Sequence, residues 1–261
     1  MSETEVAGRG IQSIEIGGRV LAALATAGGS LMLRDLAALA DLAPAQAHAY
    51  LVSFRKIGLV EQAGGRYRLG PFALQLGLAR MRSVDALRLA TQAAPGLADE
   101  LGLMVTVTVW GSLGATVVQV NEAVDQIHVN LRAGTVYSAL RTATGRVFAA
   151  FLPPNVIEAH LTASVALRGL LEPNHGETAQ ALREEVGRTR ARGYGRALGS
   201  PIPGVNAVAA PVFDHTGDLK LVLTAIGPAP LVDIEPGSAL VERLVAFARA
   251  LSSELGAPAR P

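Results

Sequence analysis

Apolar residues recur at helical spacing in three short segments near the start of the chain, at 11–27, 33–40 and 44–57. A pair of glycines follows the first segment, where glycine favours the end of a helix. Only residues 41–43 separate the second segment from the third, which leaves room for no more than a tight turn. The pattern therefore predicts three helices, of which the last two form a helix-turn-helix.

The third segment has one apolar face and one largely polar face. It begins at Pro44, whose fixed φ suits the first helical position, and it stops before Gly58. The inward positions are Ala47, Tyr50, Leu51 and Phe54. The opposite face, which is the part available to a partner, offers Gln46, His48, Ala49, Ser53, Arg55 and Lys56.

The next residues alternate as a β-hairpin does. Strands are predicted at 59–61 and 66–69 around a glycine-rich turn, and period-two alternation places Arg66 and Arg68 on the face opposite Tyr67. A helix-turn-helix followed by such a hairpin is a winged helix, a shape that places one helix in a DNA major groove. The alternative is a helical module for protein contacts with solvated charges.

Beyond the hairpin the pattern changes to longer helices and grouped strands. The predicted helices lie at 71–90, 92–101, 143–152, 154–162, 177–192 and 236–255. The predicted strands lie at 104–110, 115–121, 126–131, 193–198, 206–213 and 218–226, with a hairpin turn at 214–217. Strands grouped between helices indicate an α+β domain built on an antiparallel sheet.

Composition narrows the class of protein further. The 261 residues allow one large domain or two small ones, and half of them are hydrophobic, so a core can form. No run of about 18 apolar residues occurs, so we expect no membrane span. The polar, acidic start lacks the apolar core of a signal peptide. Cysteine is absent, which excludes disulfides and thiolate chemistry. These features predict a cytoplasmic protein.

Charge is unevenly divided along the chain. Residues 1–82 carry nine Lys and Arg against six Asp and Glu, a net charge of +3. Residues 83–261 carry the other fourteen against sixteen, a net charge of −2, and the two sums give the +1 of the whole chain. A mildly basic first part on a mildly acidic body suits phosphate contact by the first part alone.

Enzyme signatures are missing. The five histidines are scattered and no cysteine assists them, so no metal site is predicted. No G-x-S-x-G, Walker or Rossmann pattern occurs. Glu184 and Glu185 lie among arginines, as on an ion-paired, solvated helix face. We therefore expect a protein that is not an enzyme, with no catalytic residue and no cofactor.

At this point the chain resembles the IclR family of bacterial transcriptional regulators over nearly its whole length. The similar stretches, whose order and spacing carry the resemblance, are IQSIEIGGRVLAAL, the winged helix from Leu33 to Gly70 with YRLGPFALQLG, LRTATGR at 140–146, GVNAVAAPVFDHTGDL at 204–219 and LVLTAIGP at 221–228.

The resemblance implies a fold, a division into domains and a set of partners. It implies a winged helix-turn-helix over 1–70, a linker helix over 71–90 and a GAF/PAS-like antiparallel α+β effector-binding domain over 91–261. It further implies a homodimer or dimer of dimers that binds double-stranded operator DNA as a repressor or activator. The family's effectors are often small carboxylates or aromatic acids.

The recognition helix departs from the family pattern. Relatives often carry Ser, Thr or Lys near its start and Arg midway, where this chain has Ala45, Gln46 and Ala49. Base reading would then depend on Gln46, His48 and Ser53, and phosphate contact on Arg55, Lys56, Arg66 and Arg68. Two alternatives stay open: a metabolite-binding protein whose DNA module has lost specific reading, and a winged helix used for dimerisation.

The predicted effector site centres on the start of the helix at 143. Thr142 is placed to cap that helix, and free N–H groups at a helix start attract a carboxylate. The resemblance places effector contacts at Ala143, Thr144, Ala207, Thr224 and Ile226. Where relatives often have acids, Cys or Ser, this chain has LGSPIP, Ala207 and Ile226. The pocket is therefore expected to be dry, suiting a ligand with an apolar or aromatic body and one carboxylate. The alternatives are that Thr142 is only a cap and that Trp110 is core rather than a wall of this pocket.

Overall fold

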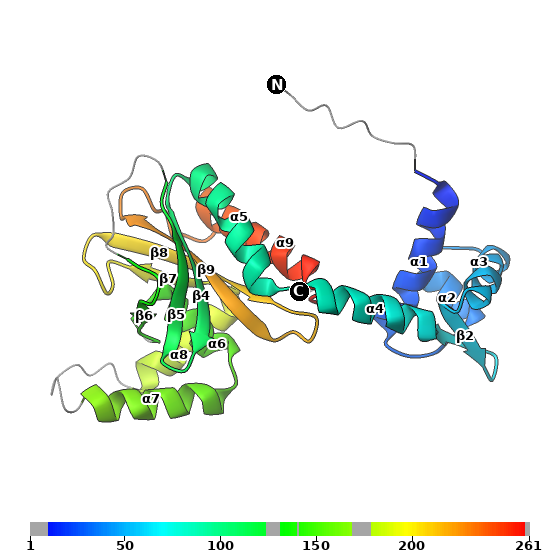
Figure 1. The fold of residues 1–261 in the computed structure, drawn as a ribbon, viewed down its shortest axis with the longest axis horizontal. Helices are drawn as coiled ribbons and strands as arrows, with labels where there is room; N and C mark the ends of the chain where they lie inside the picture. The colour runs from blue at the N-terminus through cyan, green and yellow to red at the C-terminus, as the bar shows by residue number, and fades with distance from the viewer. Residues whose placement is uncertain (1–9, 124–130, 140, 169–178, 259–261) are drawn as a thin grey trace, which may run out of the picture. The chain divides into compact units, whose positions relative to one another are not determined.

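The computed structural model describes residues 10–123, 131–139, 141–168 and 179–258 (Figure 1). The chain divides into two compact units, residues 1–84 and 85–261. Most of the strand predicted at 126–131 lies outside the described residues.

The first unit is a winged helix. Its helices are α1 (Gln12–Ala27), α2 (Leu33–Leu39), α3 (Pro44–Lys56) and α4 (Pro71–Ser83). Its antiparallel sheet has the order β1-β3-β2, formed by β1 (Leu31–Met32), β2 (Val60–Ala63) and β3 (Arg66–Leu69). β1 has only two residues, too few for the alternation that would have predicted it.

Apolar residues from the helices and the hairpin meet in one core. Leu24 of α1, Leu36 of α2 and Leu51 of α3 are almost fully buried, and Val60 and Tyr67 of the hairpin join them. α3 joins this core through Leu51 and also buries Ala47, so it packs against the unit through one face. The other face of α3 therefore stays at the surface.

The hairpin of this unit turns through two glycines. Gly64 and Gly65 have φ of 57° and 77°, and the flanking Ala63 and Arg66 are paired in register. Positive φ at both central residues defines a type I′ turn, which matches the twist of the adjoining strands. This turn projects the hairpin as a short wing.

The single helix predicted over 71–90 is wrong. Val84 is extended, with φ −103° and ψ 122°, and it separates α4 from the next helix. The side chain of Asp85 accepts hydrogen bonds from the N–H groups of Leu87 (2.9 Å) and Arg88 (3.3 Å), so a new helix begins there. Aspartate is a common residue at the start of a helix. The prediction missed this start because the apolar pattern continues across it.

The second unit is an antiparallel sheet covered by helices on both faces. Its strands follow the order β6-β5-β4-β9-β8-β7. The strands are β4 (Met104–Gly111), β5 (Gly114–Asn121), β6 (Val136–Tyr137), β7 (Gly195–Leu198), β8 (Val205–Phe213) and β9 (Leu219–Pro228). The helices are α5 (Ala86–Leu101), α6 (Ala143–Phe151), α7 (Pro154–Arg168), α8 (Ala179–Arg192) and α9 (Ala239–Glu254). This is the α+β architecture predicted from the grouped strands.

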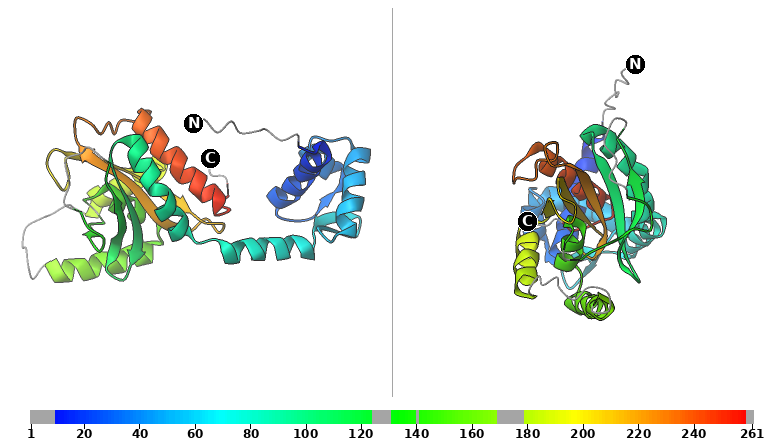
Figure 2. Two further views of the ribbon diagram at one scale, coloured as in Figure 1. Left: turned by 45° about the horizontal axis from the view of Figure 1, so that its top comes forward. Right: turned by 90° about the vertical axis from the view of Figure 1, so that its left-hand side faces the viewer.

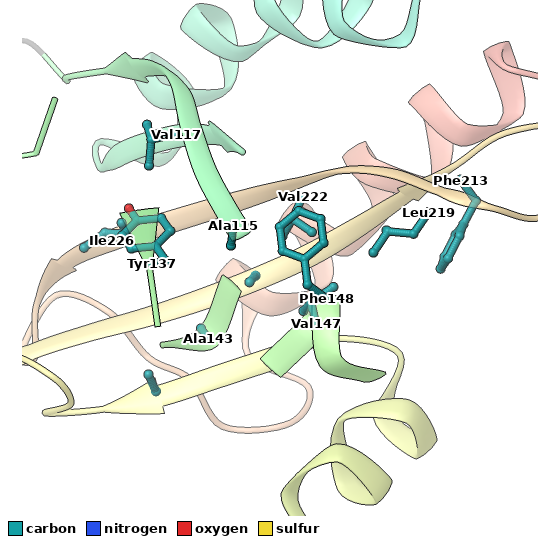
Figure 3. Packing of buried hydrophobic residues seen from close by; sticks show 12 residues of the cluster. Ala115, Val117, Tyr137, Ala143, Val147, Phe148, Phe213, Leu219, Val222 and Ile226 are labelled. Carbon is teal, nitrogen blue, oxygen red and sulfur yellow. The ribbon is translucent and has the colours of Figure 1, made fainter. Parts of the chain in front are cut away.

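The helices of this unit are divided between the two faces of the sheet. α5 and α9 pack on one face, whereas α6 packs on the other and is itself covered by α7 and α8 (Figure 2). Between the sheet and α6 lies a cluster of buried side chains that includes Tyr137, Val147, Phe148, Val222 and Ile226 (Figure 3). The start of α6 is thus enclosed within the unit.

Candidate functional site

The exposed face of α3 gathers the predicted DNA-reading residues. Ala47 and Leu51 anchor the helix in the core, and all five predicted α3 residues lie on the surface: Gln46, His48, Ser53, Arg55 and Lys56. The two basic residues, Arg55 and Lys56, lie in the last turn of the helix. The structure therefore leaves the predicted base-reading and phosphate-contacting groups of α3 accessible at the surface.

The exposed side chains of α3 differ in whether they already have hydrogen-bond partners within the protein. Arg55 donates from Nη1 to Oε1 of Gln62 in β2 at 2.9 Å, which ties the end of α3 to the wing. Ser53 donates to the carbonyl oxygen of Ala49, one turn earlier. Among the described residues, Gln46, His48 and Lys56 have no hydrogen-bond or ion-pair partner.

Both arginines of the wing are exposed, as the alternation predicted, and both have partners that it did not predict. Arg66 donates from Nε to the Ser30 hydroxyl at 3.0 Å and from Nη2 to the Ser30 carbonyl at 2.7 Å. Arg68 forms an ion pair with Glu61, its cross-strand neighbour. An exposed ion pair contributes only about 0–1 kcal/mol, so Arg68 can exchange this partner for a phosphate.

The start of α6 carries the predicted cap and two donors without an acceptor. The hydroxyl oxygen of Thr142 accepts from the N–H of Gly145 at 2.9 Å, and its own proton goes to the carbonyl of Ser138. The backbone N–H groups of Ala143 and Thr144 have no acceptor within the described ranges, although both residues are only 1% exposed. Such groups are a preferred place for a carboxylate.

The other predicted effector residues come from the sheet beneath α6. Thr224 of β9 is buried, and its hydroxyl lies 2.8 Å from that of Thr144. Ala207 and Ile226 are opposite one another in β8 and β9, two residues along from Thr224 on the same face. The structure therefore places all five predicted residues between α6 and the sheet.

Three further hydroxyls in this region were missed from the sequence. Thr106 is opposite Thr224 in register, Thr108 follows it on the same face, and Tyr137 comes from β6. All three hydroxyls are buried and none has a partner in full hydrogen-bond geometry among the described residues, although Thr106 lies near enough to Tyr137 to lower its pKa. An unpaired buried hydroxyl costs about 1–3 kcal/mol, so a group of them points to a ligand. The alternation in MVTVTVW could have revealed the two threonines, because it places both on one face.

Trp110 is a packing residue. Its ring lies 5.4 Å from that of Phe148 in α6 and 5.0 Å from that of His160 in α7, measured between ring centroids. The ring therefore joins β4 to the two helices on this face. Of the two interpretations made from the sequence, the core role fits these contacts.

Alkaline pH should weaken the second unit through Tyr137. Burial raises the pKa of Tyr137 to about 12, and the nearby Thr106 hydroxyl lowers it only in part. Above the unfolded pKa of 10.0, the unfolded chain loses a proton that the folded chain keeps, so stability falls as the pH rises. We expect a free energy of unfolding about 1.3 kcal/mol lower at about pH 11 than at about pH 9.

Urea unfolding at the two pH values measures this effect, with Tyr137→Phe as the matched variant. The phenylalanine variant lacks the titrating group, so it should lose less stability over the same interval. Equal losses in both proteins would show that Tyr137 does not carry the effect.

Among the described residues, the structure has neither a membrane-spanning helix nor a cluster of metal ligands. None of the helices is both long and apolar enough to cross a membrane. No group of three or more His, Asp or Glu side chains is arranged to hold a metal ion in the part of the chain that the structure covers.

Comparison with known proteins gives matches to both units. The domain family described as "IclR helix-turn-helix domain" matches residues 13–64, and "Bacterial transcriptional regulator IclR C-terminal" matches residues 79–253. The chain is 32% identical to the glycerol operon regulatory protein of Streptomyces griseus, over 95% of this chain and 98% of that protein. It is 24% identical to the transcriptional repressor IclR of Escherichia coli, over 84% of this chain and 80% of that protein.

A solved structure agrees with these matches. The crystal structure of Pseudomonas aeruginosa HmgR superposes with a TM-score of 0.82 at 34% sequence identity, over 96% of this chain and all of that one. The similarity therefore extends across both units.

Proposed function

The chain belongs to the IclR family of bacterial transcriptional regulators, and from this premise we propose that a small carboxylate with an apolar or aromatic body controls its binding to operator DNA. Membership makes it a regulator with a DNA-binding domain and an effector-binding domain rather than an enzyme. We assign DNA binding to residues 1–70 and effector binding to residues 91–261, with residues 71–90 joining the two. Since operator DNA lies in the bacterial cytoplasm, we place the protein there.

The observation that carries the effector class is the set of donors at the start of α6. The N–H groups of Ala143 and Thr144 offer two donors, and the hydroxyl pair of Thr144 and Thr224 adjoins them. A carboxylate oxygen can accept from such donors without a charged side chain. The surrounding cluster, which includes Tyr137 and Ile226, would hold the apolar body of the ligand.

For DNA binding we propose that different residues of the first unit contact bases and phosphates. Gln46, His48 and Ser53 would contact base edges, because they form the polar part of the exposed face of α3. The four basic residues would contact phosphates: Arg55, Lys56, Arg66 and Arg68. The bonds of Arg66 to Ser30 support a further role for this residue in holding the wing against the loop before β1.

We also propose that a second copy of the chain covers α4. No residue of α4 is buried, and Leu74, Leu78 and Met81, at 65%, 40% and 49% exposure, share one helical face. An exposed apolar stripe of this kind marks an interface. Sedimentation equilibrium of the full chain should give a dimer, and a monomer at micromolar concentration would contradict the proposal.

The test titrates the protein against labelled DNA from its own upstream intergenic region while carboxylates are added. We expect a benzoate-type acid to change the DNA affinity, whereas the corresponding neutral amide should not. Thr224→Val should weaken the acid's effect about tenfold by removing a hydroxyl from the site. Thr162→Val, which removes an exposed hydroxyl that donates to the carbonyl oxygen of Glu158 in α7, is the control and should behave as wild type. Tight binding of glyoxylate or pyruvate without binding of a benzoate-type acid would overturn the proposed ligand class.

A further inference from the structure

A hollow lies in the unit of residues 85–261, on the side of α6 that faces α8 and β7. Its volume is about 420 Å³. Six charged side chains line it and define what we call the arginine pocket: Arg146, Arg188, Arg192, Arg196, Glu185 and Glu235. None of these residues belongs to the donors proposed for the effector. The arginine pocket is therefore a separate feature.

Positive charge exceeds negative charge in the arginine pocket. The lining has four guanidinium groups and two carboxylates, a net charge of +2, and Glu184, just outside the lining, lies 3.9 Å from Arg188 and offsets part of that charge. Glu185 forms ion pairs with three of the four arginines: Arg188 and Arg192 each donate to it at 2.9 Å, and Arg146 lies 3.9 Å away. Arg146 also donates to the carbonyl oxygen of Arg196 at 2.7 Å. Because each of the four guanidinium groups offers five N–H donors and each of the two carboxylates about four acceptor positions, donors outnumber the acceptors of the lining.

The second carboxylate, that of Glu235, offsets little of the positive charge in the arginine pocket. Glu235 reaches Arg196 only at 3.5 Å, and its side chain is 74% exposed. Burial raises the pKa of Glu185, but the hydrogen bonds from Arg188 and Arg192 and the charge of Arg146 outweigh it and lower that pKa overall. Glu185 is thus held ionised in a surplus of positive charge, and an added anion would meet attraction.

We propose that the arginine pocket binds a phosphate dianion, either free or carried by a small metabolite. The planar fork of an arginine matches the spacing of phosphate oxygens, and a phosphate would be attracted by the positive charge that the carboxylates leave uncompensated. The volume is in the range of small-molecule sites. Leu198 and Ile234 also line the arginine pocket and offer apolar contact to the carbon part of a metabolite.

Calorimetric titration of the full chain at constant ionic strength tests this proposal, with inorganic phosphate, ribose phosphate and ribose as probes. We expect saturable binding of one or both phosphate probes and none of ribose. Tighter binding of ribose phosphate would identify a metabolite as the source, and equal binding would identify the free ion.

Two matched variants locate the binding. Arg188→Gln changes a side chain that is 57% exposed, so the fold should be kept, and phosphate affinity should fall about tenfold. Arg249→Gln alters an exposed arginine of α9, on the other face of the sheet, and should leave the affinity unchanged. The proposal would be overturned by an absence of saturable binding at millimolar phosphate. An affinity that Arg188→Gln leaves as in wild type would overturn it equally.

Discussion

Replacing Gly145 by alanine is expected to lower the free energy of unfolding of the second unit by about 3 kcal/mol. A Cβ at this position would lie 2.1 Å from the carbonyl oxygen of Ser138 and 2.6 Å from the Cα of Ala139. Both obstacles are backbone atoms, which cannot turn aside as the tip of a side chain can. The first turn of α6 would have to move, and with it the donors proposed to hold the effector.

The chain provides both a probe and a control for this prediction. Trp110 is the one tryptophan in the sequence, and it packs on Phe148 of α6, so its fluorescence reports urea unfolding of this unit. Gly187 lies in the middle of α8, where an added Cβ meets nothing within 4 Å. Gly187→Ala should therefore stabilise the unit by up to about 1 kcal/mol. Equal unfolding midpoints for the two variants would contradict the prediction, because they would show that residues 138–139 can move away from α6 at little cost in free energy.

A glutamate in place of Ala49 should reduce operator affinity about 100-fold, which corresponds to about 2.7 kcal/mol. Ala49 is exposed on α3, between Gln46 one turn before and Ser53 one turn after. A carboxylate there would face the acceptor groups and phosphates of the DNA without a counter-charge. Like charges brought together at an interface cost several kcal/mol.

Fluorescence polarisation with labelled upstream DNA measures this loss. Ala250→Glu adds the same charge at an exposed position of α9 in the other unit, so it should cost far less affinity. Repeating the titration at two salt concentrations separates the general effect of net charge from a local one. If the two variants bound DNA equally well, the exposed face of α3 would not be the reading surface.

The elements that the sequence predicted best are those with local start and stop signals. Pro44 and Gly58 delimit α3, two adjacent glycines make the turn of the wing, and Thr142 caps α6. Each signal acts within a few residues, so it can be recognised in a sequence. The break at Val84 was missed because apolar residues keep helical spacing on both sides of it.

The parts that could not be predicted depend on contacts between distant residues. Arg66 is held by Ser30, 36 residues earlier, and nothing near either residue in the sequence indicates that pairing. Thr144 and Thr224 are 80 residues apart, and their hydroxyls meet only because α6 crosses β9. Their role in effector binding, like that of Ala143, Ala207 and Ile226, stays a prediction until the titrations are done.

The order of the six-stranded sheet has a consequence for how copies of the protein can associate. In the sheet formed by the described residues, the two outermost strands are β6, with two residues, and β7, with four. Long, exposed edge strands invite pairing with the edge of another chain, which leads to aggregation, and very short edge strands discourage it. The long strands β4 and β9 lie inside the sheet, whereas β6 and β7 pair with only part of β5 and β8. Pairing of copies through the two outermost strands is therefore disfavoured as a route to fibrillar aggregates.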